Sequence, residues 1–223
     1  MKDGTRYASA FKKAYSKWRQ SLDTIEVPEA DDPLRRLAIA TLGVEGGDDA
    51  AARSVDRIFE TLVDWNDVRV SRADELERLA GDGTPGGRER CGRLIAALQS
   101  VYEKENKLSL DRLKSIGRRE VKQYLESLRG VDEYAVASVL LWSFGGHAVP
   151  VCDHAMNALR AASVVHPEAT RAEVQAFLER HVSANAARET CLVLERFARS
   201  NRSSPKRAAS GTSRPRERKR TGK

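Results

Sequence analysis

Residues 122–159, KQYLESLRGVDEYAVASVLLWSFGGHAVPVCDHAMNAL, contain the strongest local pattern in this 223-residue chain. Apolar residues on either side of Gly130 recur at the spacing of an α-helix. Before the glycine they are Val121, Tyr124, Leu125 and Leu128, and after it Val136, Val139 and Leu140. Because glycine permits the positive φ that a tight turn between helices commonly needs, the pattern predicts a helical hairpin. A short extended link and a third helix, up to residue 159, are predicted to follow.

The turn of this hairpin is suited to an anion. The first N–H groups of the helix after Gly130 have no acceptor inside that helix, because the chain before them is not helical. Such N–H groups, together with the positive end of the helix dipole, bind phosphate. The segment therefore predicts an anion-binding turn.

Two segments of this stretch, L-R-G-V-D-E-Y-A-V-A-S and F-G-G-H-A-V-P-V-C-D-H, carry a family resemblance. They resemble the helix-hairpin-helix and the Gly/Pro-rich, aspartate-containing loop of the base-excision DNA glycosylases of the endonuclease III type. The likeness is sharpest over residues 124–159 and extends weakly over residues 34–199. It implies an all-α fold of two lobes, one made of the central helices and one of N- and C-terminal segments. A cleft for double-stranded DNA is expected between them.

The resemblance implies that the hairpin grips the DNA backbone with six residues: Leu128, Arg129, Gly130, Val131, Tyr134 and Ala135. Arg129 stands where proline is usual in the family, and Asp132 stands where a second glycine is usual. An acidic side chain beside a phosphate is electrostatically unfavourable. Tyr134 occupies the position of the family's lysine. A phenol forms no Schiff base, so cleavage of the strand by an amine, the AP-lyase activity, is not expected.

The family's catalytic aspartate aligns with Cys152, and Asp153 is the next residue. His154 matches the histidine that follows it in the family, whereas Asn157 stands where an arginine is usual. Either a one-residue shift gives Asp153 the role of stabilising positive charge on the sugar or activating water, or the carboxylate is absent from the site. Asp153 is also suited to be the N-cap of a helix over residues 154–162, and Cys152 to be a small buried hydrophobe. Asp153 is the candidate catalytic residue.

Neither a metal ion nor another cofactor is expected. Family members often bind an iron–sulfur cluster through four cysteines near the C-terminus, and Cys191 alone falls in that region. One grouping has metal-ligating residue types at a spacing that fits no standard zinc site: His147, Cys152, Asp153 and His154. Three scattered cysteines are typical of free thiols in a reducing compartment. Without a signal-peptide pattern or a membrane-spanning apolar run, the sequence favours a cytoplasmic protein with no membrane attachment.

The positive charge of the chain is concentrated near its C-terminus. Residues 201–223 contain nine Lys or Arg and one acidic residue, whereas residues 1–200 contain 30 basic and 31 acidic residues. Since residues 201–223 lack large apolar side chains, we predict a disordered basic tail that attracts nucleic acid in a salt-sensitive way. The predicted organisation is an N-terminal helix within residues 1–29, a helical domain over 30–200, and the tail.

Apolar spacing along the chain predicts about ten helices and no clear strand. The first helix has aromatic residues aligned on one face: Tyr7, Phe11, Tyr15 and Trp18. With the lysines around them, these rings suit either core packing or base stacking, and core packing is the favoured interpretation. Residues 71–74 and 170–173 have the pattern of capping boxes at helix starts.

Two functions from different classes follow from the sequence. The first is a monofunctional DNA N-glycosylase, a base-excision-repair enzyme that flips a damaged base out of the duplex towards Asp153. The second is a catalytically silent DNA-binding relative that keeps the scaffold but lacks the lysine, the aligned carboxylate and the cluster. DNA is the partner in both, and a measurement of base release distinguishes them.

Overall fold

The computed structural model describes residues 4–81 and 83–202. Over these residues the chain is helical and contains no strand. The α-helices are α1 (Gly4–Gln20), α2 (Pro33–Gly43), α3 (Asp48–Phe59), α4 (Trp65–Val70), α5 (Ala73–Ala80), α6 (Gly87–Glu105), α7 (Arg118–Glu126), α8 (Glu133–Phe144), α9 (Asp153–Ala161), α10 (Arg171–His181) and α11 (Ala187–Arg202), with 3-10 turns η1 (Asp111–Ser115) and η2 (Ala184–Ala186). The prediction of an all-α fold is confirmed.

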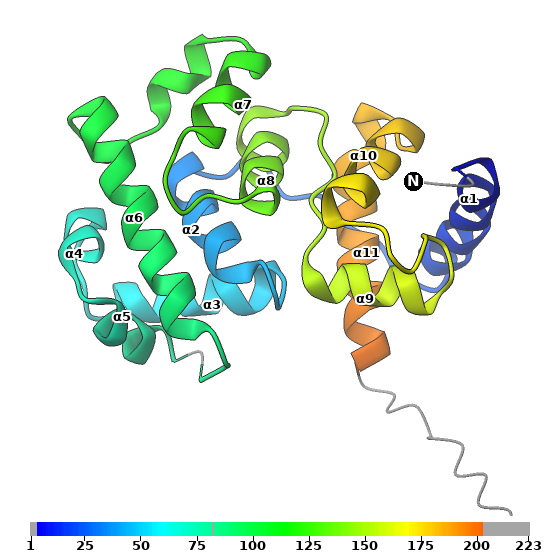
Figure 1. The fold of residues 1–223 in the computed structure, drawn as a ribbon, viewed down its shortest axis with the longest axis horizontal. Coiled ribbons are helices and arrows are strands. Elements are labelled where there is room, and N and C mark those ends of the chain that lie inside the picture. Colours follow the sequence, from blue (N-terminus) through cyan, green and yellow to red (C-terminus); the bar gives the residue numbers. More distant parts are fainter. Residues whose placement is uncertain (1–3, 82, 203–223) are drawn as a thin grey trace, which may run out of the picture.

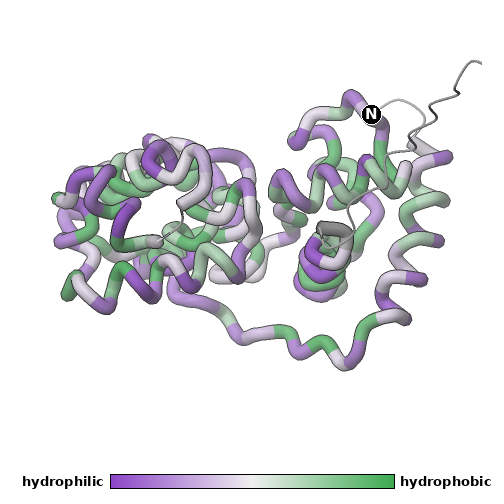
Figure 2. The backbone as a smooth tube through the Cα atoms, turned by 90° about the horizontal axis from the view of Figure 1, so that it is seen from below, coloured by the Kyte–Doolittle hydropathy of each residue, from purple (hydrophilic) through white to green (hydrophobic). Residues whose placement is uncertain are grey.

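The helices form two lobes (Figures 1 and 2). Helices α2 to α8 make one lobe, which we call the hairpin lobe, and α1 packs with α9, α10 and α11 in the other, the terminal lobe. Residues 21–32, between α1 and α2, run from one lobe to the other (Figure 2). The predicted division into a central lobe and a lobe built from both ends of the chain is confirmed.

Helix α8 is the centre of the hairpin lobe. Residues 134–142 of this helix are all buried, because α2 and α7 pack against it and α11 reaches it from the terminal lobe. A helix that is apolar all round is stable when it is enclosed on every side in this way. The turn that precedes α8 is therefore attached to a helix that is buried along most of its length.

Aromatic residues of α1 hold the terminal lobe together. Phe11 is buried and meets the ring of Phe177 of α10 edge to face, with 6.3 Å between centroids. The ring of Trp18 stacks on Phe197 of α11 at 3.8 Å. The predicted core packing of these rings is confirmed.

The two predicted capping boxes have different outcomes. Thr170 and Glu173 form the box at the start of α10, as predicted. The box predicted for residues 71–74 was wrong, since Arg72 is the N-cap of α5 and makes no side-chain capping bond. Ser71 is instead the C-cap of α4, and its hydroxyl donates to the carbonyl of Asp67 in that helix.

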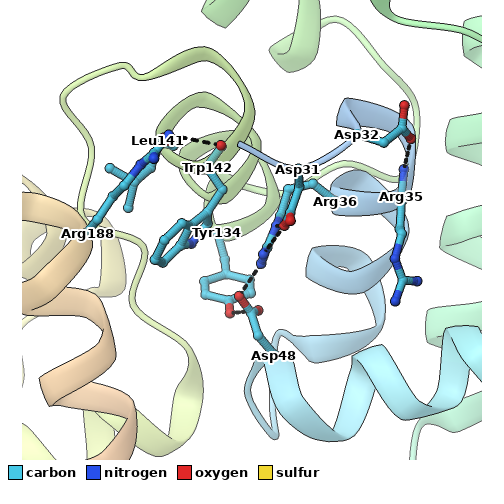
Figure 3. A network of polar contacts seen from close by, with 9 residues as sticks. All are labelled: Asp31, Asp32, Arg35, Arg36, Asp48, Tyr134, Leu141, Trp142 and Arg188. Carbon is cyan, nitrogen blue, oxygen red and sulfur yellow. Dashed lines mark hydrogen bonds and ion pairs between the residues drawn. The ribbon is translucent and has the colours of Figure 1, made fainter. Parts of the chain in front are cut away.

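Contacts between the lobes include a group at the C-terminal end of α8. Arg188 of α11 donates to the carbonyls of Leu141 and Trp142, at 3.3 and 3.1 Å (Figure 3). The guanidinium groups of Arg188 and Arg36 lie 5.7 and 5.3 Å from the Trp142 ring centre. The contact of Arg188 crosses between the lobes, whereas that of Arg36, on α2, lies within the hairpin lobe. Cation–π contacts of this kind stabilise the packing around Trp142.

The predicted division of the chain at residue 200 stays a prediction. Helix α11 continues to Arg202, into the first residues of the predicted tail, and residues 203–223 lie outside the described part. Among the described helices, none combines the length and the apolar character needed to cross a membrane.

Candidate active site between the lobes

The hairpin turn between α7 and α8 requires glycine at its centre. Gly130 has φ +77°, and a Cβ at this position would lie 2.4 Å from the carbonyl oxygen of Arg93. Arg93 Nε in turn donates to the Gly130 carbonyl at 3.2 Å. Any other residue would combine an unfavourable backbone conformation with a collision against backbone atoms.

Several backbone N–H groups of this turn make no hydrogen bond within the described part of the protein. Among the described residues, no acceptor is present for the N–H groups of Gly130, Val131, Glu133 and Tyr134. The next N–H group, that of Ala135, donates to the Asp132 carboxylate at 2.9 Å, so Asp132 is the N-cap of α8. The turn therefore has the unpaired donors that an anion-binding helix start needs.

The charge of Asp132, which is unfavourable beside a phosphate, is compensated by arginines. Its carboxylate lies 2.8 Å from Arg93 Nη2 and 3.5 Å from Arg171 Nη1. The acid at the family's second glycine position is thus part of an ion-pair network that links α6, the turn and α10. The repulsion expected from the sequence is offset within the protein.

The six predicted DNA-contacting residues do not share one environment. Leu128, Tyr134 and Ala135 are buried, whereas Gly130 and Val131 are partly exposed. The exposed residue is Arg129, whose guanidinium pairs with Glu103 at 2.7 Å. Of these six residues, Arg129 alone has an exposed side chain, and the three buried ones pack in the core beneath the turn.

Tyr134, at the lysine position, points into the interface between the lobes (Figure 3). Its hydroxyl donates to Asp48 Oδ1 at 2.6 Å. Burial and the charge of Asp48 raise the pKa of Tyr134 well above its usual value, so the phenol stays neutral. The other oxygen of Asp48 pairs with Arg36, which also pairs with Asp31. The two donors from Tyr134 and Arg36 fix the position of the Asp48 carboxylate.

The start of α9 differs from its prediction. Asp153 is the first residue of the helix and Cys152 is the N-cap, so the predicted capping by Asp153 was wrong. Cys152 Sγ accepts from the N–H of Ala155 at 3.4 Å, which leaves the Asp153 carboxylate to pair with Arg171 at 2.5 Å. Cys152 is buried, as predicted, and burial raises the pKa of its thiol to about 11, so it is not a thiolate nucleophile.

A pocket lies where the lobes meet, next to Asp48 and Cys152. Its volume is about 120 Å³, comparable to the roughly 150 Å³ of an engineered cavity that admits benzene. Three segments form it: the loop 46–47 with the start of α3, the start of α9, and α11. Its wall contains Gly46, Gly47, Asp48, Asp49, Ala50, Arg53, Cys152, His154, Glu195, Ala198 and Arg199. We call this cavity the interlobe pocket.

Glu195 is a buried acid of the interlobe pocket. Burial, assisted by the charges of Asp48 and Asp49, raises the pKa of Glu195 to about 8, so that it holds its proton at neutral pH. Sequence reasoning missed this residue and Asp48. The sequence shows only that Glu195 directly follows the apolar run Leu192–Val193–Leu194, which does not by itself indicate a site.

Hydrogen bonds between main chains hold the pocket closed on one side. The N–H groups of Asp153 and His154 donate to the carbonyls of Val44 and Glu45, at 2.9 and 3.3 Å. These bonds tie α9 to the loop after α2. Backbone hydrogen bonds between the two lobes therefore help to fix the shape of the pocket.

A second, larger cavity lies along the hairpin, between α7, α8 and α10. Its volume is about 800 Å³, and Val131, Asp132 and Arg171 are part of its wall. The predicted catalytic Asp153 lines neither this groove nor the interlobe pocket. Its side chain is 48% exposed beside Arg171.

The residues present do not fit the iron–sulfur cluster of the resembled family. Cys91, Cys152 and Cys191 are each buried and form no disulfide, and they lie on α6, at the start of α9 and on α11. A cluster needs four cysteine ligands close together. Within the described part of the chain, no group of three or more His, Cys, Asp or Glu residues is placed to bind a metal ion.

Solved structures similar to this chain are DNA glycosylases. An endonuclease III trapped as a covalent intermediate with DNA matches with a TM-score of 0.65 and 17% identity, over 86% of each chain. The 8-oxoguanine glycosylase/lyase of Clostridium acetobutylicum, bound to DNA with cytosine opposite 8-oxoG, matches with a TM-score of 0.67 and 16% identity. That match covers 90% of this chain and 71% of the other. The chain has the fold of the helix-hairpin-helix DNA glycosylases.

A thermostable thymine-DNA glycosylase matches as well, with a TM-score of 0.58 and 16% identity over 87% of each chain. No protein-family model and no curated protein matches the sequence. The predicted resemblance to this glycosylase group is thus confirmed for the fold. At such identities, function has to be argued from the site itself.

Proposed function

We propose that this protein is a DNA N-glycosylase of base-excision repair without AP-lyase activity. It binds duplex DNA at the hairpin turn, accepts a damaged base in the interlobe pocket and releases it by hydrolysis. The observation that carries the proposal is the interlobe pocket: a cavity of aromatic-ring size whose wall contains three carboxyl groups and no lysine among the described residues.

The chemistry of base release fits these groups. Breaking an N-glycosidic bond develops positive charge on the sugar, which a nearby carboxylate stabilises or exploits by deprotonating the attacking water. Asp48 is held for this role by Tyr134 and Arg36. A step through a Schiff base needs an amine, and the position of the family's lysine holds the neutral phenol of Tyr134.

The proposed DNA grip combines two parts of the chain. The unpaired N–H groups of the turn suit one backbone phosphate, and Tyr134, four residues after Gly130, connects this turn to the pocket through Asp48. The nine Lys or Arg of residues 201–223 add attraction that does not depend on sequence. A base flipped from the duplex beside the gripped phosphate would have the pocket within reach.

The predicted catalytic role of Asp153 stays a prediction and leads to the second candidate function. Asp153 is ion-paired with Arg171 and lines no cavity in the described part of the chain. If a carboxylate at the start of α9 is indispensable for this fold's chemistry, the protein is a catalytically silent DNA-binding relative. This candidate shares the hairpin turn and the basic C-terminal segment with the first.

A base-release assay over a panel of damaged duplexes tests the proposal. We expect free base from at least one lesion, with the strand broken only after alkali, because no amine cleaves it. Strand cleavage without alkali would contradict the absence of lyase activity. Duplex binding without base release from any lesion would establish the silent relative.

Binding is tested separately at the turn. Gly130→Ala is expected to weaken duplex binding at least about tenfold, since the turn must shift away from Arg93. Gly83→Ala is the matched control, because Gly83 also has positive φ (+57°) but a Cβ there meets nothing within 4 Å. Equal affinities for the two variants would remove the turn from the DNA interface.

A further inference from the structure

Glu195 lies on α11, far in sequence from the hairpin, and lines the interlobe pocket. Its carboxyl group has no hydrogen-bond or ion-pair partner among the described residues. The other two acids of the pocket are engaged, because Asp48 accepts from two side chains and Asp49 pairs with Arg199 at 2.5 Å. Asp48 and Asp49 are thus held as acceptors, and Glu195 is the acid of this pocket whose carboxyl group is placed to give a proton.

We infer that Glu195 is the general acid that gives a proton to the departing base. The inference rests on the proposed function and adds a catalytic residue to it. As the N-glycosidic C–N bond breaks, its electron pair goes to the base, and the Glu195 proton goes to a ring nitrogen or carbonyl oxygen of that base. Water adds to the sugar carbon and gives its proton to Asp48, from which it returns through solvent to Glu195. The products are a neutral base and a sugar hydroxyl.

The surroundings of Glu195 favour this role. Burial and the charges of Asp48 and Asp49 raise its pKa to about 8, although Arg36 and Arg199 act in the opposite direction. A general acid is most effective when its pKa lies near the working pH, because it is then protonated and still releases its proton. The remaining titratable or charged groups around it are Tyr134 of α8, Cys152 and His154 at the start of α9, Arg53 of α3 and Cys191 of α11.

The inference predicts which substrates depend on Glu195. A neutral damaged base leaves as an anion unless it is protonated, so its release needs the acid. A base alkylated on a ring nitrogen already carries positive charge and leaves as a neutral molecule. Glu195→Gln should therefore slow the first kind of substrate and have little effect on the second.

The test measures single-turnover base release from duplexes that contain uracil, hypoxanthine or 7-methylguanine. At pH 7, Glu195→Gln is expected to release the neutral bases about 100-fold more slowly than the native chain and the cationic base at a similar rate. With neutral bases, the native rate should fall as the pH rises through about 8 and Glu195 loses its proton, whereas the variant should lack this fall. Glu189→Gln is the matched control, on the same helix but paired with Arg19 outside the pocket.

A thermal melt separates catalysis from folding. The folded-state pKa of Glu195 lies above its ordinary 4.5, so native stability is lost as pH rises from 4.5 to about 8. The uncharged amide of Glu195→Gln avoids this loss. The variant is expected to melt above the native chain at pH 8.5, with a smaller difference at pH 5.

The outcomes are distinct. Native-like release of neutral bases by Glu195→Gln would overturn the role of Glu195 and leave the glycosylase proposal standing. If Glu195→Gln slows the release of neutral and cationic bases equally, the role is also overturned, because a proton donor is needed only for the neutral bases. No release by the native chain from any duplex would remove the proposed function and this role together.

Discussion

The start of α9 and the interlobe pocket both contain carboxylates, but their surroundings differ. Asp153, next to the aligned position of the family's aspartate, is 48% exposed and pairs with Arg171 on the surface. Asp48 is 13% exposed and is fixed by Tyr134 and Arg36 at the junction of the two lobes. The difference shows that enclosure and hydrogen bonding, more than position along the chain, mark the carboxylate prepared for chemistry.

The largest expected contrast is in stability. Asp48→Ala leaves the buried Arg36 with Asp31 alone and removes the acceptor of Tyr134, so it should cost about 3 kcal/mol. Asp153→Ala removes one exposed ion pair and should change the free energy of unfolding by about 0.5 kcal/mol or less. Urea unfolding of both variants measures the contrast. If the two variants lose similar amounts of unfolding free energy, the surroundings of Asp48 and Asp153 stabilise the protein equally.

A smaller effect is expected at the tyrosine that fixes Asp48. Tyr134→Phe removes a 2.6 Å hydrogen bond to a carboxylate without changing the ring, and should cost about 2 kcal/mol. Tyr102→Phe is the control, because Tyr102 is 41% exposed and packs against Arg69 through its ring. If the two variants unfold alike in urea, the hydroxyl of Tyr134 does not hold the pocket.

The smallest effect concerns the arginine beside the turn. Arg171→Ala removes one of the two cations that compensate Asp132, so duplex affinity should fall about threefold to tenfold at low salt, and less at high salt. Arg72→Ala is the control, because Arg72 is the N-cap of α5 and its side chain is 79% exposed. Fluorescence anisotropy with a labelled duplex measures both. Unchanged affinity for Arg171→Ala would show that the charge of Asp132 does not affect the bound DNA.

Much of the fold was predictable because it depends on local pattern. The apolar spacing on either side of Gly130 predicts helices α7 and α8, and the aromatic face of α1 packs against the core as expected. The N-cap of α5 is Arg72 and not Ser71, because capping depends on the exact path of the backbone, which composition alone does not determine.

The site was less predictable, because its residues come from separate segments. Alignment identified Tyr134 and Cys152, and both lie beside the interlobe pocket. Asp48 and Glu195 are 147 positions apart in the sequence and line the same pocket because the two lobes pack together. No local pattern relates them, so the acids of the pocket became visible only in the folded chain.

Single-turnover base release by Asp48→Asn and Asp153→Asn, on the duplex from which the native chain releases a base fastest, tests the central claim most directly. Circular dichroism of each variant first establishes that it is folded. We expect Asp48→Asn to lose at least about 100-fold in rate and Asp153→Asn to remain within about threefold of the native chain. Loss of release in Asp153→Asn, with release retained in a folded Asp48→Asn, would contradict the account and return the catalytic role to the start of α9.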